Sequence, residues 1–190
     1  MNSAPAQGRA VRALRPGIGF VLFQVAWFCC VASAARGHAG LGIAAVAVVV
    51  PILLAMSTNR RADMQLIGLA LAIGFAWDSF MAGNGIIDYA SPQPVRGFAP
   101  AWILAMWMLL APMLREPLRW MHDRPLFAAA AGGLGGALSY AAASRLGACR
   151  FPEPLVAYLA LGTGWALIMP ILLAAAKRSD RRAPGSEERA

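Results

Sequence analysis

Six long apolar stretches, separated by short polar or glycine- and proline-rich segments, divide this sequence. A helix that crosses a bilayer needs about 20 predominantly apolar residues, because it rises about 1.5 Å per residue through a hydrocarbon layer about 30 Å thick. Hydrophobic residues make up 59% of the chain and charged residues 14%, which leaves no room for a soluble domain. The sequence therefore predicts an all-α polytopic membrane protein, a bundle of six transmembrane helices. The windows of suitable length are 17–35, 39–57, 64–82, 100–119, 126–147 and 154–176.

The basic residues lie between these windows and at the chain ends. The net charge of +8 therefore indicates membrane topology rather than a nucleic-acid partner, which would favour one continuous basic stripe. If the N-terminus is inside, 13 of the 17 basic residues face the cytoplasm. We expect a bacterial cytoplasmic (inner) membrane protein with both termini in the cytoplasm. It would comprise a basic segment at 1–16, the transmembrane domain at 17–176 and a disordered tail at 177–190.

The first window has a second interpretation. Arginines precede it and it ends in Val31-Ala32-Ser33-Ala34-Ala35, which is similar to a signal peptide with a small-residue cleavage site. However, Gln24 and Trp27 interrupt the apolar core that such a peptide would need. We expect the window to remain as a helix in the mature protein, and the N-terminal sequence of that protein would decide between the two.

Asp78 is the residue that most needs a partner, because an ionised carboxylate inside a membrane costs about 2.5–3.5 kcal/mol on insertion scales. Tyr140, in the fifth window, lies at the same depth by helical rise. Arg145 lies about 7 Å further outward, within reach of a long side chain that leans back toward the midplane. We therefore expect Asp78, Tyr140 and Arg145 to converge. The alternatives are a purely structural ion pair, or an Arg145 that extends outward to lipid headgroups.

Two polar features of the first and fourth windows are also candidates. Gln24 should hydrogen-bond to a neighbouring helix, although together with Trp27 it is a candidate ligand contact. Pro112 should kink the fourth helix, and Arg115 with Glu116 reads as a pair at headgroup level.

Small residues recur along one ridge of the fifth window, and such ridges allow another helix to approach closely. A ridge of this kind more often serves packing than binding, although Ser139 is also a candidate ligand contact. The ridge comprises Gly132, Gly136, Ser139, Ala143 and Gly147.

No motif for an enzyme, a metal or a cofactor is present in the sequence. The chain has two histidines, which is too few for a histidine-built metal centre, and the glycines near 132–136 lie within a membrane helix rather than after a strand. We therefore predict no cofactor and no catalytic residues.

Several short patterns nevertheless resemble a bacterial family of small polytopic inner-membrane proteins catalogued as a domain of unknown function. They are Phe23-Gln24, Trp27-Phe28 with Cys30, Asp78 followed by glycines, Trp102 and Trp107, Trp165, Pro170, and above all GGALSYAAASRLGA at Gly135 to Ala148. The resemblance covers about 16–176, and this chain has Leu138 where the family pattern has a proline. It implies that the first helix belongs to the mature fold, and an envelope lipid role.

We expect membrane lipids and a small amphipathic or lipid-like ligand as partners, bound or translocated near Asp78, Tyr140 and Arg145, together with a membrane or envelope protein. Two alternatives remain open. The protein could be a membrane-embedded enzyme or enzyme subunit in lipid modification, with Asp78 as general base. It could instead be a non-catalytic membrane scaffold whose small-residue ridge stays open to lipid.

Overall fold

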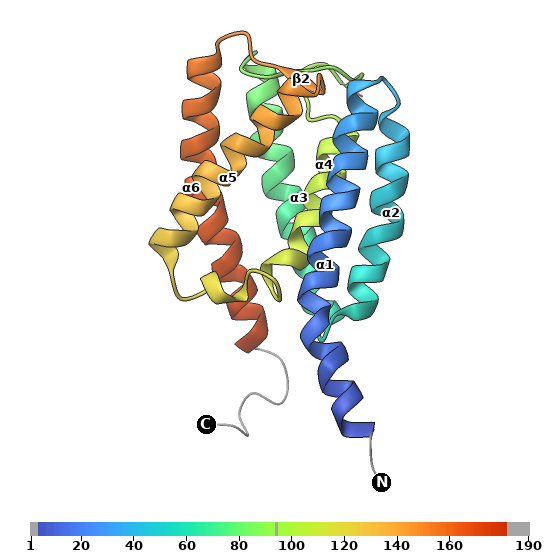
Figure 1. Ribbon diagram of the computed structural model, residues 1–190. Helices are drawn as coiled ribbons and strands as arrows, with labels where there is room; N and C mark the ends of the chain where they lie inside the picture. Colours follow the sequence, from blue (N-terminus) through green and yellow to red (C-terminus); the bar gives the residue numbers. More distant parts are fainter. Residues whose placement is uncertain (1–3, 94, 182–190) are drawn as a thin grey trace.

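The computed structural model describes residues 4–93 and 95–181 and contains six α-helices within them, so the predicted all-α fold is confirmed. The helices run alternately up and down, and the first and last helices reach the same end of the bundle (Figure 1). The elements in chain order are α1 (Ala4–Ala35), α2 (Ala39–Met56), α3 (Arg60–Gly83), β1 (Asp88–Tyr89), α4 (Ala101–Leu110), the 3₁₀ helices η1 (Ala111–Leu114) and η2 (Arg119–Met121), α5 (Pro125–Arg145), β2 (Cys149–Arg150) and α6 (Pro154–Arg181).

Five of the six helices are long and apolar enough to span a membrane, and the fourth is shorter than the predicted window 100–119. Its apolar stretch is Ala101–Leu114, and its α-helical part ends at Leu110. Pro112 explains the difference, because proline has no N–H to donate and its ring clashes with the preceding turn. The chain therefore tightens into η1 instead of kinking and continuing as an α-helix.

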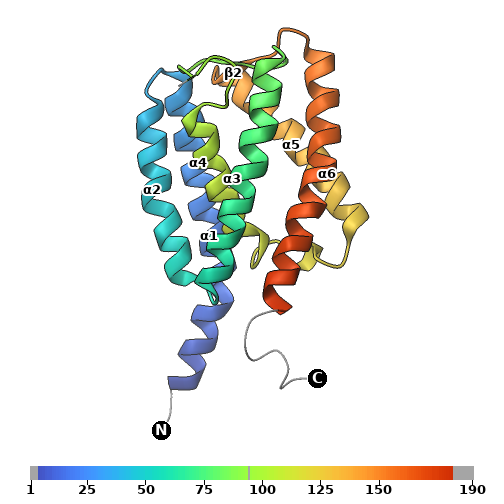
Figure 2. The ribbon, with the colours of Figure 1, turned by 180° about the vertical axis from the view of Figure 1, so that it is seen from behind.

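Two helix pairs flank a central pair. α1 packs along α2, and α5 packs along α6, while α4 contacts α1, α2 and α3, and α3 joins α4 to α6. Figure 2 shows α3 from behind, between these two outer pairs. The short α4 is the most enclosed helix, with Trp102 and Leu109 at 1% and 0% exposure. The core thus lies around α4, and its two sides are built by different ends of the chain.

The ends of α3 and α5 are built alike and bring two distant loops together. Gly85 and Gly147 follow the last helical turns with φ of 67° and 90°, a conformation that favours glycine. The chain then enters β1 and β2, which pair antiparallel with Tyr89 opposite Cys149. The Arg150 guanidinium and the Asp88 carboxylate form an ion pair across the ladder, with an N–O distance of 3.0 Å. This ladder fixes Tyr89 above the space between the helix pairs.

The small-residue ridge of α5 lies mostly against α6. A Cβ on Gly132 would stand 2.4 Å from Met169 Cβ, and one on Gly136 would stand 2.2 Å from Trp165 Cγ, so a larger side chain fits at neither position. Ser139 instead accepts a hydrogen bond from Trp27 of α1, and Gly147 lies beyond the end of the helix. The protein's own α6 therefore covers the part of the ridge that the scaffold interpretation needs to be open.

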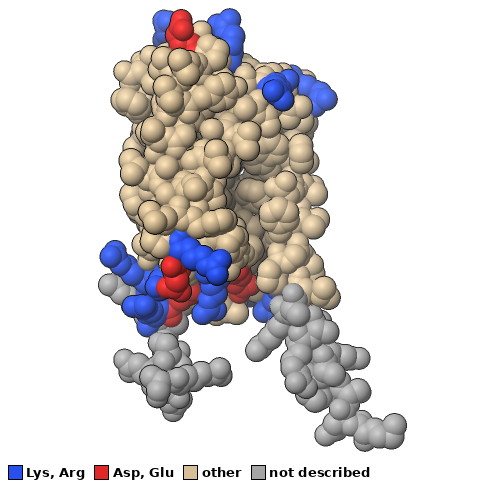
Figure 3. Space-filling view, turned by 60° about the vertical axis from the view of Figure 1, so that its left-hand side comes forward, with Lys and Arg blue, Asp and Glu red and all other residues tan. Residues whose placement is uncertain are grey.

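On the face that Figure 3 shows, the charged residues lie in two layers, at the two ends of the bundle, with an apolar band between them. This distribution is the one expected for a bundle that crosses a bilayer. α6 continues to Arg181, past the end of the predicted window at 176, and the remainder of the predicted disordered tail, 182–190, lies outside the described residues.

Arg115 is buried, with 6% of its side chain exposed, rather than paired with Glu116 at headgroup level as predicted. It bonds Asp63 Oδ1 at 3.0 Å and Asp180 Oδ1 at 2.6 Å, which ties the start of α3 to the end of α6. Burial alone would lower its pKa, but hydrogen bonds and charges from Asp180 and Asp63 raise the pKa above its ordinary value. We call Arg115, Asp63 and Asp180 the ionic cluster.

Candidate functional site

Asp78 is fully buried on α3 and accepts three hydrogen bonds. Oδ1 accepts from the hydroxyls of Tyr89, at 2.7 Å, and of Tyr140, and Oδ2 accepts from Trp107 Nε1 at 2.7 Å. The contact with Tyr140 confirms the depth match predicted from helical rise. Burial raises the pKa of Tyr89 well above its ordinary value, so its hydroxyl keeps its proton and remains a donor. We call Asp78 and its three donors the carboxylate cluster.

Arg145 does not join the carboxylate cluster, so the predicted contact with Asp78 is wrong. It is exposed at the end of α5, and it makes no hydrogen bond or ion pair within the described part of the chain. The reason is that α5 ends at Arg145 and the chain turns at Gly147, so the guanidinium lies at the edge of the bundle, where water can solvate it. The partners of Asp78 are two phenol hydroxyls and one indole N–H instead of the predicted guanidinium of Arg145.

Helical spacing explains how the carboxylate cluster is assembled. Gly74 lies one turn before Asp78, and a Cβ on Gly74 would stand 2.3 Å from the Trp107 ring, so glycine is what lets that indole lie across α3 and reach the acid. Gly136 stands in the same relation to Tyr140 on α5, with Trp165 across it. The rings of Trp107 and Trp165 stack at 4.8 Å with 4° between their planes. The two glycines thus hold a stacked indole pair beside the acid.

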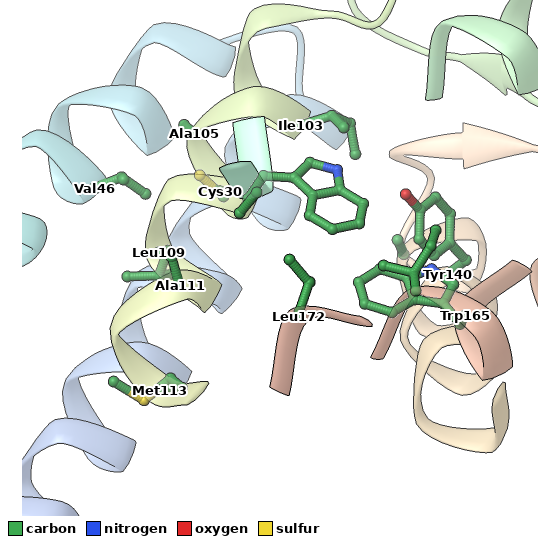
Figure 4. Close-up of a cluster of buried hydrophobic side chains, with 14 of the residues drawn as sticks. Cys30, Val46, Ile103, Ala105, Leu109, Ala111, Met113, Tyr140, Trp165 and Leu172 are labelled. Carbon is green, nitrogen blue, oxygen red and sulfur yellow. The ribbon is translucent and has the colours of Figure 1, made fainter. Parts of the chain in front are cut away.

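A cavity of about 500 Å³ adjoins this cluster between α1, α4, α5 and α6, and we call it the interhelical cavity. Tyr89, Trp107 and Tyr140 form part of its wall, so Asp78 lies directly behind them. Figure 4 shows Tyr140 and Trp165 across the interior from Ala105 and Leu109 of α4. The surface is hollowed by a crevice in the apolar band (Figure 3).

Four of the candidate ligand contacts line the interhelical cavity: Gln24, Trp27, Ser139 and Tyr140. Asp78 lies behind the wall, and Arg145 is not part of the lining. The Trp27 indole donates to Ser139 Oγ at 3.2 Å, which links α1 to α5. Gln24 makes no side-chain hydrogen bond within the described residues, contrary to the expected bond to a neighbouring helix. Gln24 is half-buried and lines the cavity, so it borders an open space as well as its neighbouring helices.

Sequence reasoning missed the aromatic wall. Trp102, Trp107 and Trp165 line the cavity, as does Tyr89. Tyr89 lies between two predicted windows, and Trp102, Trp107 and Trp165 carry no predicted role beyond the family resemblance. One signal was available: a buried carboxylate without a nearby cation needs indole or phenol donors, and few such groups exist in the chain.

The chemistry of the wall is mainly apolar and uncharged. No Asp, Glu, Lys, Arg or His is among the lining residues that the structure describes. The indole N–H groups of Trp102 and Trp165 are buried without an acceptor in the described part of the chain. Burial, followed by the charge of Asp78, raises the pKa of Cys149 to about 12, so this lining thiol stays protonated and unreactive. No group of three His, Cys, Asp or Glu suited to a metal occurs within residues 4–93 and 95–181.

The family described as "Protein of unknown function (DUF2878)" matches residues 17–171 of the chain, and the chain belongs to this family. The matched range includes α2 to α5 completely, most of α1 and the part of α6 that carries Trp165. Neither the curated proteins nor the solved structures gave a match.

Proposed function

We propose that this member of the DUF2878 family binds a small amphipathic or lipid-like ligand in the interhelical cavity. The observation that carries the proposal is the cavity itself. Its volume of about 500 Å³ lies within the range of about 300–1,000 Å³ that is usual for small-molecule sites. The lining is largely apolar with a few polar groups, which is the character of a site that holds a molecule of mixed polarity.

The position of the opening favours entry from the lipid. Phe28 of α1 and Leu138 of α5 both line the cavity, yet they are 55% and 68% exposed. Both belong to helices long enough to span the membrane, so their exposed surfaces would face acyl chains. A ligand already dissolved in the bilayer could then pass between α1 and α5 without crossing a polar surface.

Three polar groups support a ligand that also carries polar atoms. Gln24 lines the cavity and its amide has no partner in the described residues, and the buried N–H groups of Trp102 and Trp165 lack acceptors there. Unsatisfied polar groups in an apolar setting are costly, and a ligand oxygen that reached them would remove part of that cost. A pure hydrocarbon would leave all three unsatisfied.

The two alternative functions have weaker support. Tyr89, Trp107 and Tyr140 occupy the carboxylate oxygens of Asp78 and stand between it and the cavity, which does not favour a general base. The scaffold alternative needs an open ridge on α5, and α6 covers Gly132 and Gly136. Ligand binding is the function that uses the cavity.

A cavity-filling substitution tests the proposal. Gly135 lines the cavity, and a Cβ there would meet nothing within 4 Å, so Gly135→Leu should fill the space without a steric clash. Gly68→Leu is the matched control, because Gly68 also lies in a long helix with open space around it but does not line the cavity. The measurement is mass spectrometry of lipids and small amphiphiles retained by each protein after extraction in native-lipid particles.

We expect the wild type and Gly68→Leu to retain the same distinct amphiphile, and Gly135→Leu to lose it while its thermal transition remains cooperative. Retention of the same molecule by all three proteins would contradict binding in the cavity. So would the absence of any species beyond the bulk lipids of the particle in the wild-type sample.

The end of the bundle where α1 begins and α6 ends is proposed to face the cytoplasm. Arg60, Arg115 and Lys177 are among the basic residues at that end, whereas Arg36, Arg96, Arg145 and Arg150 follow or precede helices at the other end. A reporter fused to the C-terminus that is active only inside the cell should be active in a bacterial host. Activity of a periplasmic reporter at the same position would reverse the assignment.

A further inference from the structure

We infer that the head of the ligand is an organic cation, such as a substituted ammonium group, held among aromatic side chains in front of the Asp78 carboxylate. This inference rests on the proposed function, because it concerns the ligand of the same cavity. It replaces the anionic group that a contact with Arg145 would have favoured, since Arg145 lies outside the lining.

Aromatic residues are concentrated in the wall. Four of the six tryptophans and two of the three tyrosines of the chain line the interhelical cavity: Trp27, Trp102, Trp107, Trp165, Tyr89 and Tyr140. The faces of indole and phenol rings carry partial negative charge and attract cations, and several rings around one space form the usual site for a quaternary ammonium group. Among these rings, the indole of tryptophan attracts cations most strongly.

A carboxylate with no cation beside it among the described residues lies behind the rings. Asp78 accepts three hydrogen bonds, from two phenols and one indole, and this is the pattern that an ionised carboxylate satisfies without donating a proton itself. It forms no ion pair within the described residues. When ionised, this carboxylate would attract a cation in the cavity with little screening, because the surroundings are of low polarity.

The two tyrosine hydroxyls add to the same preference. Their protons are directed to Asp78, so a ligand can approach the oxygens of Tyr89 and Tyr140 only as a donor or as a positive charge. The lining also contains no Lys or Arg that would repel a cation among the described residues. The rings, the carboxylate and the hydroxyl oxygens therefore all favour a positive head, while the apolar wall accommodates its tail.

Three amphiphiles with the same octyl chain and different heads separate the effect of head charge on binding from the effect of hydrophobicity. Octyltrimethylammonium, octanol and octyl sulfate carry a cationic, a neutral and an anionic head, and each would be titrated into the full-length protein in nanodiscs. Binding would be followed by tryptophan fluorescence, since four indoles line the cavity, with protein-free nanodiscs as the background. We expect the cation to bind about tenfold or more tightly than octanol, and octyl sulfate to bind least.

Asp78→Asn should remove the difference between the cation and octanol. Glu153→Gln is the matched control, because it also deletes one carboxylate, but an exposed one that does not line the cavity. The control should keep the wild-type order. The comparison of three heads on wild-type protein remains decisive even if Asp78→Asn does not fold.

The outcomes distinguish the two proposals. If octanol binds as tightly as the cation, or if octyl sulfate binds best, the cation preference is overturned while binding in the cavity stands. The same conclusion follows if Asp78→Asn is folded and keeps a tenfold preference for the cation. If none of the three binds above the nanodisc background, the proposed ligand site fails, and the cation preference fails with it.

Discussion

The ionic cluster and the carboxylate cluster each contain a buried aspartate, but the two aspartates have different kinds of partner. Asp63 is paired with Arg115, which also bonds Asp180, so charge meets opposite charge at the end of the bundle that carries the termini. Asp78 has three uncharged donors and no cation among the described residues. A compensated cluster ties helices together, whereas an uncompensated one beside a cavity leaves a field that can act on a ligand.

The largest effect on stability is expected in the ionic cluster. Arg115→Met should lower the free energy of unfolding by about 3–5 kcal/mol, because it leaves two carboxylates without their cation. Unfolding in a mixed-micelle titration would measure it, with Arg150→Met as the control, since Arg150 is 80% exposed. A loss equal to that of the control would mean that the ionic cluster does not hold α3 to α6.

The carboxylate cluster should respond less to the loss of one donor. Tyr140→Phe removes one hydrogen bond to a charged acceptor and should cost about 1.5–3 kcal/mol in the same titration. Tyr158→Phe is the control, because Tyr158 is 42% exposed and has no contact with Asp78; it should change stability by less than about 0.5 kcal/mol. Equal effects of the two substitutions would indicate that the hydrogen bond from Tyr140 to Asp78 does not stabilise the fold.

Gly74 leaves the space in which the Trp107 ring packs, and that packing lets Trp107 reach Asp78. Gly74→Ala places a methyl group where the indole now lies and should cost about 1–3 kcal/mol through overpacking. Gly68→Ala, two turns earlier in α3, meets only open space and serves as the control. Gly74→Ala should also change the tryptophan fluorescence spectrum, as Trp107 leaves Asp78, and an unchanged spectrum would contradict the seating of the ring on Gly74.

The smallest effect is expected at the β1–β2 ladder. Asp88→Ala removes an ion pair whose side chains are 47% and 80% exposed, so the loss should be about 0.2–1 kcal/mol and should shrink as salt is added. Repeating the unfolding titration at high ionic strength measures this. A larger effect that salt does not reduce would show that the ladder, like the ionic cluster, is shielded from solvent.

Periodicity and composition predicted the helices, because a membrane span leaves a long apolar record in the sequence. They overestimated the length of α4, because the apolar run of the sequence continues past Pro112, whereas the α-helix ends before it. Depth arithmetic brought Tyr140 to Asp78, since both depths follow from one repeat distance. It failed for Arg145, because the position of a side chain at a helix end depends on where the chain turns.

The aromatic wall was beyond this kind of reasoning. Trp107 reaches Asp78 because Gly74 leaves room for an indole on a neighbouring helix, and no periodicity in either helix shows that match. Tyr89 reaches the acid through a two-residue ladder between loops that lie far apart in the chain. The cavity depends on how α1 and α5 are held relative to each other, which is a property of the whole bundle.

The order in which the donors of Asp78 occur along the chain has a consequence for biogenesis. Tyr89 follows Asp78 by 11 residues, Trp107 by 29 and Tyr140 by 62. At about 5–20 residues per second, a ribosome needs about 3–12 seconds to travel from the acid to its last partner. For that interval α3 lacks the full set of donors that surrounds its carboxylate in the folded protein, because the last of them arrives only with α5.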